Sequence, residues 1–154
     1  MTTPTPYPDT TIHRIFDGLL LRGLCSGTGE NDAYCVMQAV NLAERGLSTS
    51  KGIRDITDDA VCVARAPRRL AIRLNDRSWS SAVARANGLR RLGHALIGSK
   101  GIDEKAWARA VGHRYIADIL PQSLRALSAV QYYAPEKAAL LAAASRCEED
   151  KNLA

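Results

Sequence analysis

The sequence predicts an all-α protein, a single compact helical domain of about six or seven helices. Apolar residues recur at intervals of three and four along most of the chain, and glycines and prolines divide it into segments of helical length. Alternation typical of strands occurs only around residues 60–76, and almost nothing else in the chain offers such strands a partner. The chain has 154 residues, of which 46% are hydrophobic and 24% charged, so it can bury a core without crosslinks or metal ions.

Two amphipathic helices are expected in the N-terminal third of the chain. The first covers residues 10–24, because apolar residues recur there at helical spacing and Gly23 lies near its end. Asp32 is expected to cap the second helix, and Gly46 is expected to end it. With that cap, Cys35 would lie in the first turn of the second helix.

The segment 60–76 fits two structures. Its alternation would suit two short strands that turn near Pro67. A helix suits it as well, because proline is tolerated in a first helical turn and the apolar residues from Leu70 onward would share one face. We favour the helix. A further helix is predicted over residues 80–97, and its inward side would consist of Val83, Ala86, Leu89, Leu92 and Leu96.

Three more helices are expected in the C-terminal third. Asp103 is the expected cap of the first of these, and Pro121 is expected to end it, since proline interrupts the helical hydrogen-bond ladder. The next would cover residues 123–133 and begin at a serine cap. The last would cover residues 135–147, with a proline in its first turn.

The helices are expected to form one domain over residues 9–147. A disordered proline-rich tail at residues 1–8 and a frayed acidic tail at residues 148–154 would flank it. The N-terminus lacks the pattern of a secretion signal, and we expect a cytoplasmic protein that does not enter a membrane. The four cysteines show no spacing typical of a zinc site or a disulfide framework, so we predict reduced thiols, no metal ion and no cofactor.

Positive charge is concentrated in the middle of the chain. Residues 60–100 hold nine Lys and Arg residues and a single acidic residue, whereas the segments before and after carry net charges of −3 and 0. In a helix, the arginines from Arg65 to Arg77 would recur every fourth residue and form a stripe about 18 Å long. The next helix would add a second polar face that also contains Asn87 and His94. The predicted binding surface consists of Arg65, Arg69, Arg73, Arg77, Arg90 and Arg91.

These arginines favour a non-catalytic binding module whose partner is a nucleic acid or an acidic protein. Two alternatives use the charge differently. The chain can be a subunit or cofactor of a larger phage or bacterial assembly that makes no nucleic-acid contact, and an oligomer is compatible with the sequence. The arginines can also be solvated or pair with Asp55, Asp58, Asp59 and the acidic C-terminal tail.

A third alternative is a cysteine hydrolase that uses Cys35. In the first turn of a helix, unpaired backbone N–H groups lower the pKa of a thiol and make it more nucleophilic. Such an enzyme also needs an imidazole as a base, which only His13, His94 or His113 could supply.

The run Cys35-Val36-Met37-Gln38-Ala39-Val40, together with Cys62 followed after eleven residues by Leu74-Asn75-Asp76, resembles a pattern in small proteins of actinobacteria and their phages whose activity is not known. The resemblance covers roughly residues 27–120. It implies a bacterial or phage origin and a helical middle segment, and it implies no activity.

Overall fold

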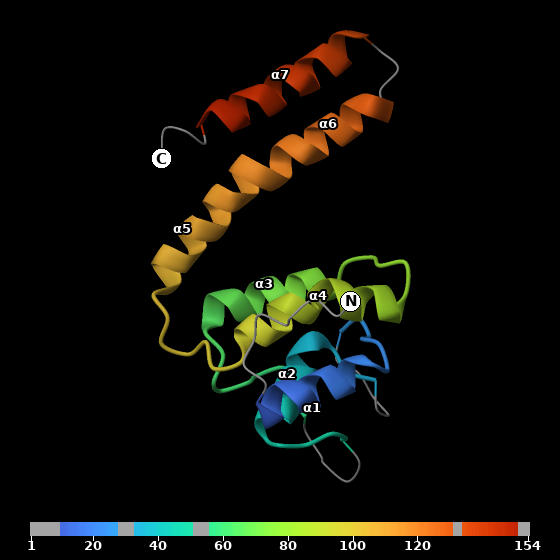
Figure 1. Ribbon diagram of the computed structural model, residues 1–154, viewed down its shortest axis with the longest axis vertical. Coiled ribbons are helices and arrows are strands. Elements are labelled where there is room, and N and C mark those ends of the chain that lie inside the picture. Colours follow the sequence, from blue (N-terminus) through green and yellow to red (C-terminus); the bar gives the residue numbers. More distant parts are fainter. Residues whose placement is uncertain (1–9, 28–32, 51–55, 131–133, 151–154) are drawn as a thin grey trace. The chain divides into compact units, whose positions relative to one another are not determined.

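The structure is a computed structural model, shown in Figure 1, and it describes residues 10–27, 33–50, 56–130 and 134–150. Within these ranges every regular element is a helix, so the all-α prediction is confirmed. Leu24 and Tyr34 form an isolated parallel β-bridge. The helices, which we expected to form one domain, group into two compact units.

The N-terminal unit, Met1–Ile102, contains the first four helices that the structure describes, and the C-terminal unit, Asp103–Ala154, contains the helices that follow. The tail expected at residues 1–8 lies outside the described residues. None of the helices that the structure describes combines the length and the apolar character needed to cross a membrane.

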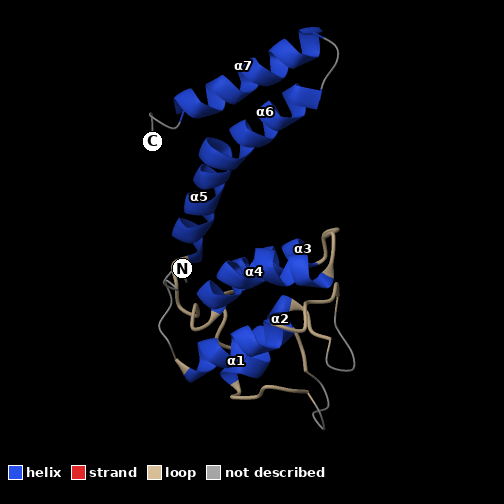
Figure 2. Cartoon of the chain, turned by 45° about the vertical axis from the view of Figure 1, so that its right-hand side comes forward, coloured by secondary structure: helices blue, strands red, loops and turns tan. Residues whose placement is uncertain are grey.

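The helices of the N-terminal unit are packed in two layers, with α3 and α4 over α1 and α2 (Figures 1 and 2). Helices α1 and α4 run antiparallel, because His13 contacts His94 near one end of the pair while the N–H of Leu24 bonds to the carbonyl of Ala82 at the other. The four helices are α1 (Thr11–Leu20), α2 (Val36–Glu44), α3 (Arg65–Asn75) and α4 (Ala82–Leu96).

The core of this unit consists mainly of aliphatic side chains, together with Phe16, Tyr34, Met37 and Cys35. A fully buried side chain of this size contributes about 1.5–3 kcal/mol to stability, so this cluster supplies most of the driving force for folding. Helices α1 and α4 approach closely at Gly93, where an added Cβ would lie 2.1 Å from the Cζ of Phe16. The fully buried large side chains include Phe16, Leu19, Leu24, Met37, Leu42, Leu89 and Leu96.

Helix α2 begins three residues later than an Asp32 cap implies. Cys35 is itself the N-cap, and its Sγ accepts the N–H of Gln38, while the side chain of Gln38 accepts the N–H of Cys35. This reciprocal capping box satisfies two donors that would otherwise be unpaired at the helix start. The prediction that Asp32 caps this helix is therefore wrong, and Asp32 itself lies outside the described residues. Gly46 ends the helix as expected, with a φ of +72°.

The segment 60–76 forms helix α3 from Arg65 onward, so the helical interpretation is confirmed over the hairpin. Pro67 is the third helical residue, a position whose N–H has no partner within the helix. Val61, which a buried strand would have needed, is 80% exposed.

In the C-terminal unit, a π-turn joins two α-helices into one long helix. Asp103 caps the start as expected, accepting the N–H groups of Lys105 and Ala106. The helix does not end at Pro121, which lies buried near the start of its last segment. The three segments are α5 (Glu104–Arg114), η1 (Tyr115–Ile119) and α6 (Leu120–Val130).

The π-turn explains why proline is tolerated there. The N–H of Leu120 bonds to the carbonyl of Tyr115, five residues back, so the turn is wider than an α-turn. A wider turn relieves the clash between a proline ring and the carbonyl four residues earlier. Ser123 is therefore no cap, and its hydroxyl instead donates to the carbonyl of Ile119 within the helix.

Helix α7 (Ala134–Asp150) packs against α6 and η1 to form a helical hairpin (Figure 2). It begins beside Pro135 as expected but continues beyond Cys147, so residues 148–150 are helical and not a frayed tail. An ion pair between Glu148 and Arg125 ties this last turn to α6. Residues 131–133 and 151–154 lie outside the described residues.

Candidate functional site

The predicted arginine stripe lies on α3 for most of its length. Arg65, Arg69 and Arg73 recur every fourth residue and are exposed. Arg77 is also exposed but follows the end of the helix, after the C-cap residue Asp76. The distance along the helix axis from Arg65 to Arg73 is about 12 Å at 1.5 Å per residue. The structure therefore brings three of the four arginines onto one helical face and places the fourth in the turn that follows.

Two acidic side chains near this helix have partners other than Arg69, Arg73 and Arg77. Arg68 forms an ion pair with Asp59, and Asp76 accepts the N–H of Gly27. In the part of the chain that the structure describes, no carboxylate pairs with Arg69, Arg73 or Arg77.

The buried face of α4 matches the prediction at Ala86, Leu89 and Leu96, but it is rotated toward Gly93 and His94. His94, expected on the polar face with Asn87, is buried, whereas Val83, expected in the core, is 57% exposed. The close contact of Gly93 with Phe16 explains this rotation, because only the face that carries glycine allows α4 to approach α1 so closely. The residues of α4 that are buried are Ala86, Leu89, Gly93, His94 and Leu96.

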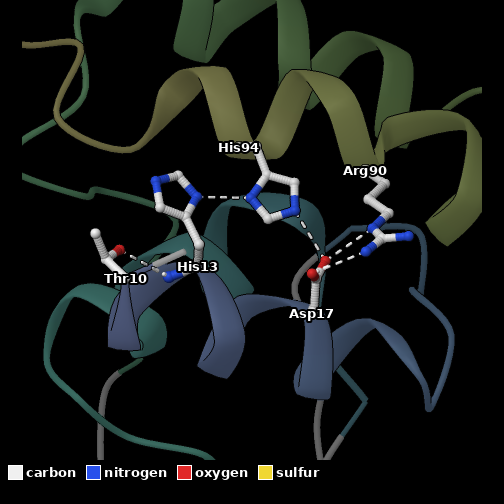
Figure 3. Close-up of polar contacts among 5 residues, drawn as sticks. All are labelled: Thr10, His13, Asp17, Arg90 and His94. Atoms are coloured by element: carbon white, nitrogen blue, oxygen red, sulfur yellow. Dashed lines mark hydrogen bonds and ion pairs between the residues drawn. The ribbon is translucent and has the colours of Figure 1, made fainter. Parts of the chain in front are cut away.

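Arg90 and Arg91 consequently have different environments. Arg91 is exposed. Arg90 makes a bidentate ion pair with Asp17 of α1, with Nε to Oδ1 and Nη2 to Oδ2 distances of 2.8 Å each. Figure 3 shows the third nitrogen of Arg90 directed away from this carboxylate. Arg90 therefore holds two helices together, a role that the predicted binding surface did not assign to it.

Asp17 is also the end of a chain of hydrogen bonds in which His94 lies between Asp17 and His13 (Figure 3). The Nε2 of His94 lies 2.8 Å from Oδ1 of Asp17, and the Nδ1 atoms of His94 and His13 are 2.7 Å apart. Because an ionised carboxylate only accepts hydrogen bonds, the Nε2 of His94 carries a proton, and the two Nδ1 atoms share a single proton. The edge of Phe16 packs on His94 at 5.0 Å between ring centroids.

Burial and hydrogen bonding shift the protonation of this network. Burial by itself raises the pKa of Asp17, but hydrogen bonds from Arg90 and His94 outweigh it, and the pKa is lowered. Burial and the neighbouring His94 lower the pKa of His13, against an opposing effect of Asp17. The hydrogen bond with Asp17 raises the pKa of Arg90. The network is therefore most stable with an ionised carboxylate and a neutral His13.

A groove of about 440 Å³ lies between α1 and α4, beside the Asp17–Arg90 pair. Its polar lining includes Arg14, Arg90 and Asn87, and its apolar lining includes Leu21 and Val83. His13 does not line the groove, and both oxygens of Asp17 are already bonded. The groove thus offers no group that is placed for acid–base or nucleophilic chemistry.

The structure contradicts the lowered pKa expected for Cys35. Burial raises the pKa of this thiol to about 11, although the N–H groups of Gln38 and Met37 favour the thiolate. The Sγ of Cys35 accepts a hydrogen bond as the N-cap of α2. His13 and His94 bond to each other, and His94 also bonds to Asp17. This environment is typical of a structural thiol and not of a nucleophile.

Cys62 also has a polar partner, since its thiol donates a hydrogen bond to Glu44. Burial raises the pKa of Glu44, against a hydrogen bond from the backbone of Gly98. Over the residues that the structure describes, no three His, Cys, Asp or Glu side chains are grouped so that they could hold a metal ion.

Sequence reasoning did not identify Asp17 or the contact of His13 with His94. His13 and Asp17 are four residues apart and so lie on one side of the first helix, a spacing that predicts that the two side chains are neighbours. Their partners are 81 and 73 residues away, however, and no local pattern connects them.

The chain matches no protein-family model, no curated protein and no solved structure with which it was compared. The origin implied by the cysteine pattern therefore stays a prediction.

Proposed function

We propose that the chain is a helical nucleic-acid-binding module that uses the arginine surface of α3 to contact a phosphate backbone. The observation that carries the proposal is the set of exposed arginines on and after α3 without a carboxylate partner among the described residues: Arg69, Arg73 and Arg77. Unpaired guanidinium groups in one row suit a polyanion, because each can meet a phosphate bidentately.

The spacing of these arginines fits a nucleic-acid strand. One strand of duplex DNA places a phosphate about every 3.4 Å along the helix axis, so the roughly 6 Å along α3 from Arg69 to Arg73 corresponds to about two phosphate steps. The net charge of +5 carried by residues 1–102 attracts a polyanion over a longer range. No array of Asn and Gln accompanies the arginines on α3, so the proposed contact is with the backbone and not with base edges.

Salt dependence of binding tests the proposal. With three or four phosphate contacts, the logarithm of the affinity for duplex DNA should fall with the logarithm of salt concentration with a slope of about −3 to −4. Fluorescence anisotropy with a labelled duplex and a labelled single-stranded RNA, between about 50 and 200 mM salt, measures this slope. Replacing Arg69 and Arg73 with Gln should make the slope shallower by about 1.5–2.

A matched control removes the same charge from the other unit. Arg109 and Arg146 are exposed there, and the Arg109→Gln/Arg146→Gln variant should keep the wild-type slope. An equal loss in both variants would mean that only net charge matters. No binding to either nucleic acid at low salt would refute the proposal and leave an acidic protein surface as the explanation for the charge.

A further inference from the structure

The helical hairpin of the C-terminal unit has a very small interior. Among the residues of this unit that the structure describes, the buried ones are Ala117, Pro121, Ser128 and Ala144. Those on the long helix belong to the two segments that α7 packs against, η1 and α6. Such small side chains let the two helices approach closely but bury little apolar surface.

A second line of residues along the same long helix is apolar and exposed. Tyr115, Ile119, Leu127 and Val130 are between 52% and 66% exposed, and Ser123 lies midway among them. Positions three or four residues apart share one face of a helix, so these five residues form one stripe. We call it the hairpin stripe, and no residue of it belongs to the buried set that faces α7.

The area of the hairpin stripe is close to what a stable dimer needs. Side chains of this size present about 150–200 Å² when fully exposed, so the four large residues and the adjacent Ile116, 48% exposed, offer roughly 500 Å² of apolar surface. That is as large as the biggest apolar patch on a typical monomer. A standard interface buries about 800 Å² on each partner, and about 65% of a homodimer interface is apolar, which is also about 500 Å².

Charge around the hairpin stripe favours a copy of the same unit as its partner. Residues 103–154 contain seven basic and seven acidic residues, so two such units meet without net repulsion. Beside the hairpin stripe, Arg114 pairs with Asp118 and Arg125 pairs with Glu148. They provide no excess charge that would select a strongly acidic or basic partner.

The order of residues along the hairpin stripe also fits an antiparallel pair. A two-fold axis through Ser123 would place Tyr115 of one copy opposite Val130 of the other, and Ile119 opposite Leu127. Each large side chain then meets an apolar one, and the small serines meet at the axis, as an isologous interface requires.

We propose that two copies of this chain associate through the hairpin stripe, with their long helices antiparallel, to form a four-helix arrangement from two hairpins. The partner is a second copy of the chain, and the contact is independent of the arginine surface on α3.

Sedimentation equilibrium of the full chain tests the proposal. The wild type should approach about 33 kDa, twice the chain mass of 16.7 kDa, as its concentration rises from low to hundreds of micromolar. Ile119→Glu and Leu127→Glu should each shift the protein to the monomer mass, and high salt should not dissociate the wild type. Leu21→Glu is the matched control, because Leu21 is 86% exposed in the other unit, and it should leave the dimer intact.

A crosslink tests the geometry separately and does not depend on the glutamate variants folding. Ser123→Cys should form an intermolecular disulfide under mild oxidation, identified by mass spectrometry of the linked peptide. Gln122→Cys, one residue away and off the hairpin stripe, should not.

Four results would overturn the proposal. The first is a wild-type protein that stays monomeric at every concentration, whether or not it binds lipid vesicles. A monomer destabilised by Leu127→Glu would show that the hairpin stripe is covered within one chain. Dimers that survive both glutamate variants, or that fail to crosslink through Ser123→Cys, would mean that another surface associates. None of these results bears on nucleic-acid binding, so the two proposals fail separately.

Discussion

Replacing Gly93 with alanine should destabilise the N-terminal unit, although alanine is the better helix former. A Cβ at this position would lie 2.1 Å from Cζ and 2.7 Å from Cε1 of Phe16. Ordinary contacts between carbon atoms are about 3.5–4.0 Å, so the ring or the helix must move by roughly 1.4 Å or more. Phe16 is fully buried and packs on His94, which leaves the ring little room to yield.

The size of the effect follows from two opposing terms. Overpacking a core costs about 1–3 kcal/mol, and replacing glycine by alanine inside a helix gains about 1 kcal/mol. Because the added Cβ would overlap two atoms of a fully buried ring, we take the overpacking cost at the upper end, about 2–3 kcal/mol, and expect Gly93→Ala to lower the free energy of unfolding by about 1–2 kcal/mol. Gly18→Ala is the control, because Gly18 is exposed in α1 and its added Cβ would meet nothing within 4 Å. It should raise the free energy of unfolding by up to about 1 kcal/mol.

Urea unfolding followed by tryptophan fluorescence measures both variants. The chain has two tryptophans, Trp79 in the N-terminal unit and Trp107 in the C-terminal unit, so a Trp107→Phe background reports on the N-terminal unit. Phe16→Leu should recover part of the loss in Gly93→Ala, since it removes the colliding ring atoms. A Gly93→Ala protein as stable as the parent would refute the close helix contact.

Three further predictions concern the N-terminal unit. Its free energy of unfolding should fall as the pH drops below 6.5, because the pKa of His13 is lowered in the folded state and the unfolded chain therefore protonates this histidine at a higher pH. Urea titrations at several pH values should show this loss of stability, and His13→Gln should remove it. A second loss should follow below about 3.8, where the unfolded chain protonates Asp17 before the folded one does. Asn75→Ala should lower the free energy of unfolding by about 2–4 kcal/mol in the same assay. The buried side chain of Asn75 accepts the N–H of Val36 and donates to the carbonyl of Cys25, and both backbone groups would lose this partner. A loss below 1 kcal/mol would contradict this account. Iodoacetamide at neutral pH should label Cys35 more slowly than a model thiol, because a pKa of about 11 leaves almost no thiolate, and labelling at the model rate would contradict its burial.

Local chemistry made most helices predictable. The Asp103 cap and the Gly46 terminator lie next to the backbone groups that they serve, so sequence alone located these helix ends. Pro67 favoured a helix over a hairpin for a reason that is also local, namely the missing N–H that a first turn does not need.

Other features depended on the wider structure. The proline rule predicted a helix end at Pro121, but the π-turn before it removes the clash on which that rule depends. Cys35 became a cap because α2 starts at Val36, whose N–H is held by Asn75 from α3. Asn75 is 39 residues away from Val36, so no pattern near residue 35 predicts this contact.

The sequence by itself determined that this protein is helical and that its positive charge lies in the middle of the chain, because helix formation and charge density depend on neighbouring residues. Only the tertiary structure decided which arginines remain without a carboxylate partner. Arg90 is held by Asp17, 73 residues away, and Arg68 by Asp59, while Arg69 and Arg73 face outward. An ion pair needs two groups within about 4 Å in space, and that separation is set by helix packing, not by distance along the chain.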